Sequence, residues 1–217
     1  MKNFIIFIII IIIFFSNIPI FCDNLMDQLL AEKFSEAIDY KTSEVRNTAI
    51  SFVSTKNGGN YNIYQVCDIY DSVYKKWIYI NDPNSQSSYL APASETIKSW
   101  RGDCDDYAIL MTALVQAIGG TARIVCVNGK NNQSGHVYPE LYIGNSEELT
   151  KDILKSISYR YNDNTINYKI YKNEENENEY WLNLDWTSSH PGGKYFNGKN
   201  SILIIYSNGS YERINIK

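Results

Sequence analysis

A change of hydrophobic period at Gly119-Gly120 constrains the fold of this chain more than any other feature. Before these glycines, apolar residues recur every three or four positions, which is typical of amphipathic helices. After them, apolar and polar residues alternate, which is typical of strands with one buried face. Helices followed by strands predict an α+β domain whose helices pack on an antiparallel sheet.

The helical half contains four candidate segments. Residues 26–54 predict one or two amphipathic helices, residues 63–77 a further helix and residues 94–100 a short one. The segment 105–118 is apolar on nearly every face and ends at the two glycines. We therefore expect a buried helix there, with a glycine in the left-handed conformation at its end.

The second half predicts six strands and one interrupting helix at residues 147–157. Asn208-Gly209 favours a tight hairpin turn between the last two strands. Residues 173–179 are acidic and polar, so we interpret them as a solvated loop. The predicted strands are residues 121–127, 136–143, 166–171, 180–186, 201–206 and 211–216.

The composition excludes several classes of protein. The 217 residues are 44% hydrophobic and 20% charged, so the chain can bury a core and is not disordered. A formal net charge of −4, with no basic cluster, argues against nucleic-acid binding. The few cysteines and histidines lack the spacing of a zinc site, and no glycine-rich phosphate-binding motif occurs.

The N-terminus has the three parts of a secretory leader, namely Lys2, an apolar run at residues 4–15 and the helix breaker Pro19. We expect residues 1–22 to export the domain to the periplasm, the cell envelope or the extracellular space. A retained anchor and a lipoprotein acylated at Cys22 stay open as alternatives, and the leader is the only membrane contact we expect. An oxidising compartment would also permit a Cys67–Cys126 disulfide.

Cys104 is the candidate nucleophile. Asp103 is placed to cap the buried helix, which puts Cys104 in its first turn, where free N–H groups and the helix dipole favour a thiolate. Asp105 and Asp106 oppose this effect because nearby carboxylates disfavour another negative charge. A neighbouring imidazolium would decide in favour of the thiolate. The alternative interpretation is that Cys104 is a small buried apolar residue.

A histidine and an aspartate in the strand half complete a candidate site. His136 begins one predicted strand, and Asp185 lies within the apolar strand 180–186, where a carboxylate is costly unless it is paired. Together with Cys104 they match the nucleophile, base and orienting group of thiol acyl-transfer enzymes. His190 is the rival base, but its loop of glycine and proline should hold an imidazole less firmly than a strand.

These residues resemble the transglutaminase-like superfamily, which shares the papain-like cysteine-enzyme fold. Residues 102–108, Gly-Asp-Cys-Asp-Asp-Tyr-Ala, are similar to its nucleophile motif; residues 136–142 resemble its histidine strand, and residues 184–186 its Leu-Asp-aromatic motif. The resemblance implies that Cys104 is the nucleophile, His136 the base and Asp185 the orienting carboxylate. It also implies a domain at residues 61–217, preceded by a helical segment at residues 23–60.

Asp105 stands where animal cross-linking transglutaminases have tryptophan, so the chain is more similar to the bacterial and archaeal protease-like members. This implies a cysteine peptidase or amidase that acts on peptide, isopeptide or other amide bonds of a protein or peptide substrate. An acyltransferase that uses an amine acceptor and a non-catalytic binding module stay open.

We expect no cofactor. Some members of the superfamily use calcium, for which Asp103, Asp105 and Asp106 are candidate ligands. Their spacing is not that of an EF-hand loop, and we prefer to interpret them as helix-capping residues.

Overall fold

The computed structural model describes residues 24–82, 89–129 and 134–215. The predicted leader and Cys22 lie outside these ranges. No helix within them is long and apolar enough to cross a membrane.

A six-stranded antiparallel sheet forms the second half of the chain, as the alternating pattern predicts, with the strand order β5-β6-β4-β3-β7-β8. Gly209 has a φ of 83° in the turn between the last two strands, a conformation that favours glycine. The strands are β3 (Ala122–Gly129), β4 (His136–Gly144), β5 (Tyr168–Lys172), β6 (Asn178–Asn183), β7 (Gly198–Tyr206) and β8 (Tyr211–Asn215).

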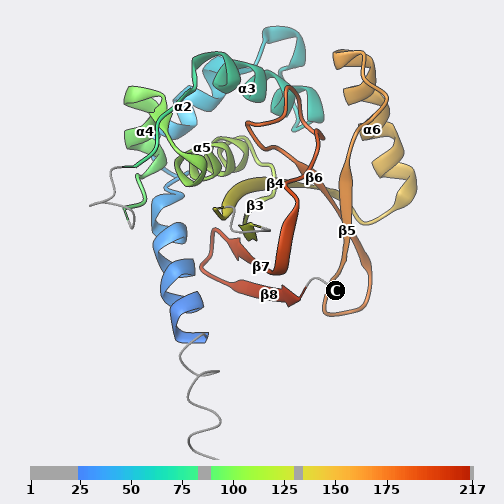
Figure 1. Cartoon of the computed structure of the whole chain (residues 1–217). Coiled ribbons are helices and arrows are strands. Elements are labelled where there is room, and N and C mark those ends of the chain that lie inside the picture. The colour runs from blue at the N-terminus through green and yellow to red at the C-terminus, as the bar shows by residue number, and fades with distance from the viewer. Residues whose placement is uncertain (1–23, 83–88, 130–133, 216–217) are drawn as a thin grey trace, which may run out of the picture.

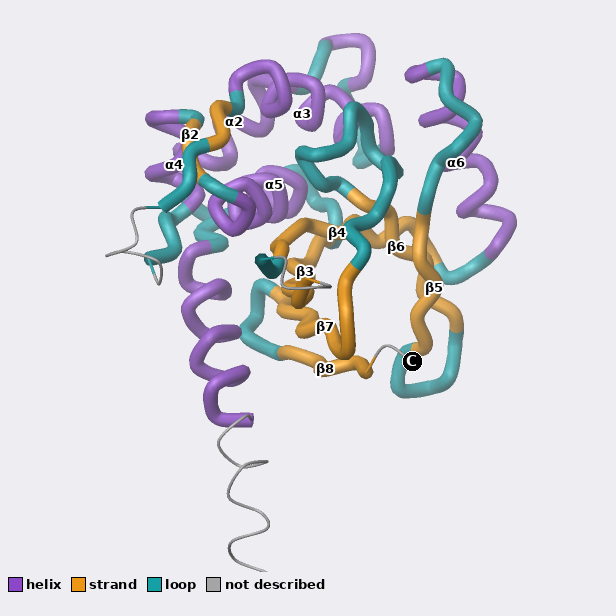
Figure 2. Tube along the Cα trace, in the orientation of Figure 1, coloured by secondary structure: helices purple, strands orange, loops and turns teal. Residues whose placement is uncertain are grey.

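The helices gather on one side of the curled sheet, with α5 at the centre of the molecule (Figures 1 and 2). Residues 26–54 form two helices. The second begins after Thr42, whose side-chain oxygen accepts the Val45 N–H and caps the helix. The first covers residues 24–37 of the described chain. The others are α2 (Ser43–Phe52), α3 (Ile63–Lys76), α4 (Ala93–Ser99), α5 (Cys104–Ala117) and α6 (Glu147–Tyr161), with a short 3₁₀ turn, η1 (Thr55–Asn57), between α2 and α3.

Helix α5 is the centre of the main hydrophobic core. Ile109, Leu110 and Leu114 are fully buried, and the core also contains Phe34 of the 24–37 helix and Val45 of α2. The N-terminal helices therefore share one core with the helix that carries Cys104. Together with the antiparallel sheet, this confirms the predicted α+β class.

A second, two-stranded sheet precedes α5 and was not expected from the sequence. Strand β1 (Ile78–Tyr79) pairs in parallel with β2 (Arg101–Gly102), and Tyr79 lies opposite Gly102. Strands of two residues are too short to show alternation, which is why the pattern misses them. Their pairing places Tyr79 next to the start of α5.

The strand predicted at residues 180–186 ends earlier than expected, and Asp185 is not part of it. Strand β6 stops at Asn183, whose side-chain oxygen accepts the Asp185 N–H at 3.0 Å. The chain then turns, with the Ser188 N–H donating to the Asp185 carbonyl at 3.1 Å. The prediction that Asp185 lies within this strand is therefore wrong, because a hydrogen bond from its N–H to the Asn183 side chain replaces the next backbone bond of the sheet.

Cys67 and Cys126 are free thiols, so the disulfide considered from the sequence is absent from the described structure. Cys67 lies on α3 beside Arg160 and Tyr161, whereas Cys126 lies on β3 near Asp105. Burial raises the pKa of both thiols to about 12. The two thiols therefore have different neighbours and are not paired with each other.

Arg123 and Glu140 form a buried ion pair on the sheet. The Arg123 side chain is 1% exposed and that of Glu140 is fully buried, and Nε and Nη2 donate to one carboxylate oxygen at 3.0 and 2.8 Å. The guanidinium also stacks on Trp181, 3.6 Å from its ring centroid. Glu140, which belongs to the motif that begins at His136, thus has a structural role.

The substitution Glu140→Leu should destabilise the protein by about 3–5 kcal/mol, because it leaves the Arg123 charge buried without its carboxylate. Urea denaturation monitored by circular dichroism measures the loss. The double variant Arg123→Met/Glu140→Leu is the matched control and should recover most of the stability. Equal stabilities of the single and double variants would contradict this role of the pair.

Candidate active site

The first turn of α5 holds Cys104 in place through a capping box. The Asp103 carboxylate accepts the Asp105 N–H at 3.2 Å, and the Asp106 carboxylate accepts the Asp103 N–H at 3.3 Å. A Cβ on Gly102 would lie only 2.1 Å from Asp106 Oδ2, so the box requires glycine there. The predictions that Asp103 caps the helix and that Cys104 lies in its first turn are confirmed.

His136, at the start of β4, joins the cysteine to the aspartate. Its Nε2 lies 2.7 Å from Asp185 Oδ2, and their side chains are 10% and 1% exposed. A side-chain hydrogen bond links the same imidazole to Cys104. Because Nε2 is occupied by Asp185, Nδ1 is the nitrogen left for the thiol. The structure thus brings together the three residues that the sequence selects.

Burial and hydrogen bonding change the pKa of His136 in opposite directions. Burial lowers the pKa of the imidazole, but the hydrogen bonds to Asp185 and Cys104 outweigh it and raise the pKa to about 9. The ring is therefore an imidazolium at neutral pH. A positive charge in contact with a thiol at a helix N-terminus favours the thiolate.

Several groups besides His136 hold Asp185 in place. Its Oδ1 accepts the Thr187 N–H at 3.2 Å, and its own N–H donates to Asn183. The buried Tyr70 hydroxyl donates to the Asp185 carbonyl at 2.8 Å and also contacts the Ser188 carbonyl. These contacts orient the carboxylate, and sequence reasoning missed both Asn183 and Tyr70 because they act through the folded backbone.

Aromatic rings surround the three residues. Tyr79 stacks on Trp186 with 4.8 Å between ring centroids, and Phe196 lies 4.9 Å from the His136 ring. Burial raises the pKa of the Tyr79 hydroxyl, and the proximity of Cys104 raises it further. Tyr79 is thus a neighbour of the thiol that the sequence alone does not identify, because only the β1–β2 pairing brings it there.

His190, the rival base, lies away from Cys104. Its Nε2 is 3.1 Å from Asp163 Oδ2, its Nδ1 is 2.8 Å from the Pro191 carbonyl, and its ring stacks on Tyr161. Both ring nitrogens are therefore engaged by groups outside the Cys104 cluster. This histidine fixes the loop that follows Asp185.

Asp103, Asp105 and Asp106 offer one oxygen each within 4.8 Å of one another. Burial and the neighbouring Asp103 raise the pKa of Asp105 to about 9, and burial raises that of Asp106 to about 6. Such oxygens fit the donor set of a calcium ion in chemistry. Two of the three, however, already serve the capping box, which accounts for their position without a cation.

The site joins three groups in one chain of contacts: a thiol at a helix N-terminus, an imidazole and a buried carboxylate. Thiol acyl-transfer enzymes have this arrangement. The family model of the transglutaminase-like superfamily matches residues 46–152. This matched part of the chain is therefore similar to the superfamily that the sequence motifs suggest. No curated protein matches the chain in sequence.

Solved structures give distant likenesses. A candidate cysteine protease of Cytophaga hutchinsonii is 17% identical with a TM-score of 0.41, and the match covers 80% of this chain and 52% of that protein. The chain thus spans about half the length of the Cytophaga protein. Calcium-bound LapG of Legionella pneumophila is 17% identical with a TM-score of 0.41, covering 75% and 76% of the two chains. A further LapG structure is 16% identical with a TM-score of 0.39, covering 83% and 89%.

The His136 imidazole should titrate near pH 9 in nuclear magnetic resonance spectra of the wild type. In Asp185→Asn it should titrate at a lower pH, because the hydrogen bond and charge that raise its pKa are weakened. The chain has two histidines, so a His190→Gln spectrum assigns the signals. An unchanged His136 titration in Asp185→Asn would contradict this coupling.

The raised pKa of His136 also makes the stability of the fold depend on pH. Because the folded pKa lies above the ordinary value of 6.5, the charged His136 stabilises the fold fully below pH 6.5 and loses that contribution as the pH rises through about 9. The stability difference between wild type and His136→Gln should therefore shrink over this window. Urea midpoints across the window measure it.

Proposed function

We propose that this chain is an exported cysteine peptidase or amidase that opens peptide, isopeptide or other amide bonds through an acyl-enzyme on Cys104. One observation supports this most directly: His136 contacts the Cys104 thiol on one side and the buried Asp185 carboxylate on the other. The match of residues 46–152 to the transglutaminase-like superfamily supports the same chemistry.

In the first half-reaction, the Cys104 thiolate attacks the carbonyl carbon of the amide and forms a tetrahedral oxyanion. The His136 imidazolium then donates its proton to the leaving nitrogen, the C–N bond breaks, and a thioester remains on Cys104. Asp185 keeps the imidazole oriented while its charge changes. The raised pKa of His136 suits this step, because the proton is already on the ring when the thiolate attacks.

The start of α5 is the proposed oxyanion site. The first N–H groups of a helix have no partners within the helix, and the capping box uses those of Asp103, Asp105 and Asp106. The box leaves the Cys104 N–H, which can donate to the developing oxyanion. The Tyr79 hydroxyl is a nearby polar group that can face the same oxygen.

In the second half-reaction, neutral His136 takes a proton from water, the hydroxide attacks the thioester, and the carboxylic acid leaves as the thiol is restored. An amine in place of water would give acyl transfer, the alternative function. Mass spectrometry of peptide mixtures with and without an added amine separates the two. Amine incorporation in excess of hydrolysis would replace the hydrolase proposal with an acyltransferase.

The variant Cys104→Ser should fold and lose turnover to background, because a hydroxyl is far less acidic than a thiol and His136 cannot activate it sufficiently. Asp185→Ala should keep a residual rate, about 10²- to 10⁴-fold below wild type, because the nucleophile stays and only the orientation of the imidazole is lost. Labelling with an acyl-directed thiol probe, followed by turnover of peptides found in the screen, measures both effects.

The variant His190→Ala is the matched control, and it should retain most of the thiol reactivity that His136→Ala loses. Each variant is first shown to be folded by circular dichroism and thermal midpoint. Wild-type turnover in folded Cys104→Ser would place the nucleophile elsewhere.

We also propose that residues 1–22 act as the secretory leader, residues 23–60 as a helical segment and residues 61–217 as the transglutaminase-like domain. The charged start and apolar run support export to the periplasm, the envelope or the outside. Fractionation of cells that express the full chain, with N-terminal sequencing of the product, tests it. A cytoplasmic protein with an intact N-terminus would contradict the proposal, whereas a retained N-terminus in the membrane would indicate an anchor.

A further inference from the structure

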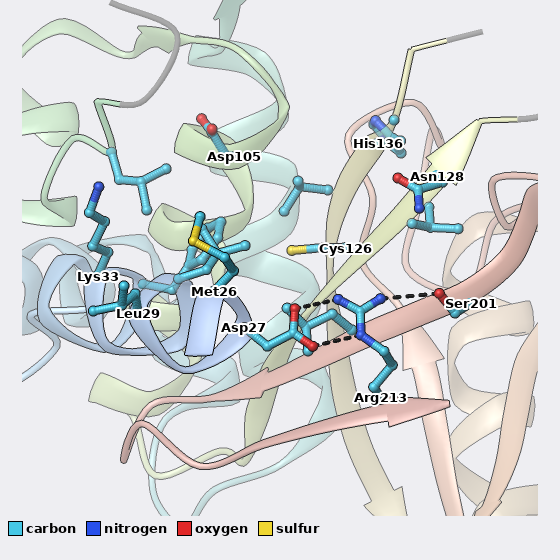
Figure 3. A pocket seen from close by; sticks show the side chains of 17 residues that line it. Met26, Asp27, Leu29, Lys33, Asp105, Cys126, Asn128, His136, Ser201 and Arg213 are labelled. Carbon is cyan, nitrogen blue, oxygen red and sulfur yellow. Dashed lines mark hydrogen bonds and ion pairs between the residues drawn. The ribbon is translucent and has the colours of Figure 1, made fainter. Parts of the chain in front are cut away.

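A cavity of about 620 Å³ extends from His136 and Asp105 to the helix of residues 24–37 (Figure 3). Its wall is mainly apolar and comes from two sides. The main apolar lining residues are Leu29, Leu30 and Phe34 from the helix, and Val127, Val137 and Leu203 from the sheet. Because His136 lines it, the cavity adjoins the candidate site, and its lining residues Phe34 and Leu203 also belong to the main core.

The charged side chains that line this cavity include an Asp27–Arg213 ion pair, together with Lys33 and His136. Arg213 Nε donates to Asp27 Oδ2 at 2.6 Å, Nη2 contacts the other carboxylate oxygen, and Nη1 donates to Ser201 at 3.1 Å, as Figure 3 shows. Burial raises the pKa of the Cys126 thiol to about 12, so this lining thiol is neutral at neutral pH.

The helix of residues 24–37 is fixed in place as a wall of this cavity. Besides the Asp27–Arg213 pair, the Ser35 hydroxyl donates to the Ser207 carbonyl at 2.8 Å, and the Tyr211 hydroxyl contacts Asn24 Oδ1 at 2.6 Å. The helix nevertheless leaves large apolar side chains open to solvent on the cavity, since Met26 is 61% exposed and Leu29 is 45% exposed. Grouped exposed apolar residues beside polar ones are typical of binding sites.

We propose that this cavity binds a bulky apolar side chain of the substrate, on one side of the bond that Cys104 attacks. The inference rests on the proposed function and specifies its substrate class: proteins or peptides with a large aliphatic or aromatic residue next to the scissile amide. The cavity lies beside His136. A substrate side chain bound in it therefore brings the substrate backbone next to Cys104 and His136. Burial of such a side chain lowers the barrier to attack when the contact persists in the transition state.

Peptidyl vinyl sulfones are suitable probes, because they alkylate an activated cysteine and can be varied on both sides of the reacting carbon. One series carries alanine, leucine or phenylalanine on the acyl side, and the other carries methyl or phenyl on the sulfone. In wild type, a bulky apolar group in one of these two positions should raise the inactivation rate about 10- to 100-fold, the range that apolar pockets give. Iodoacetamide, which carries no such group, reports the intrinsic reactivity of Cys104.

Leu29→Asp should abolish this preference and leave the iodoacetamide rate unchanged. Leu25→Asp is the matched control: Leu25 is 46% exposed on the same helix and does not line the cavity, so its variant should keep the preference. Met26→Asp tests the same wall at a second position and should also weaken the preference. Circular dichroism verifies that all three variants fold.

The outcomes separate the two proposals. Equal rates with alanine, leucine and phenylalanine, and with both sulfones, would overturn the inference while the proposed function stands, as would a preference that survives in both Leu29→Asp and Met26→Asp. A wild-type Cys104 that reacts with neither iodoacetamide nor any vinyl sulfone would overturn the proposed function and this inference with it.

Discussion

The position at which α5 begins is the constraint on which the rest of the site depends. The helix is buried on nearly every side, so the free N–H groups of its first turn must find partners within the protein. The carboxylates of Asp103 and Asp106 supply them, and Gly102 leaves the room they need. Since β2 also ties this backbone to β1, Cys104 has no freedom to move along or around the helix axis. The thiol is thus fixed by the end of a secondary-structure element and by its cap.

The electrostatics of the site follow from that position. The cap brings three aspartates next to a thiol, a surplus of negative charge that would oppose a thiolate. Two features reduce the surplus: burial keeps Asp105 neutral at neutral pH, and His136 stays positive because Asp185 lies 2.7 Å from its ring. The Asp185 carboxylate is bound in its apolar setting by both the Thr187 N–H and His136. The imidazolium therefore lies between a fixed carboxylate and the thiol.

The sequence predicted most of this arrangement, because periodicity and capping are local properties. The change of period at Gly119-Gly120 identified the helical and strand halves, and Asp103 before an apolar run indicated where α5 starts. What it missed depends on single side-chain contacts and on the pairing of distant segments. Asp185 lies beyond β6 because the Asn183 side chain binds its backbone, and Tyr79 reaches the thiol through a strand pair of two residues. Neither contact leaves a periodic signal in the chain.

The proposed reaction centre and one wall of the proposed substrate cavity come from different parts of this chain. Cys104 and His136 lie within residues 46–152, the part that matches the family model, whereas the helix of residues 24–37 lies outside it. That helix joins the body through buried apolar residues such as Phe34 and through polar contacts such as the Asp27–Arg213 pair, and it forms one wall of the cavity beside His136. Under the proposed function, the cavity face of this helix would select the substrate side chain, while His136 lines the same cavity on the side of the reaction centre. The proposed selectivity thus depends partly on residues outside the family match and partly on residues next to the thiol.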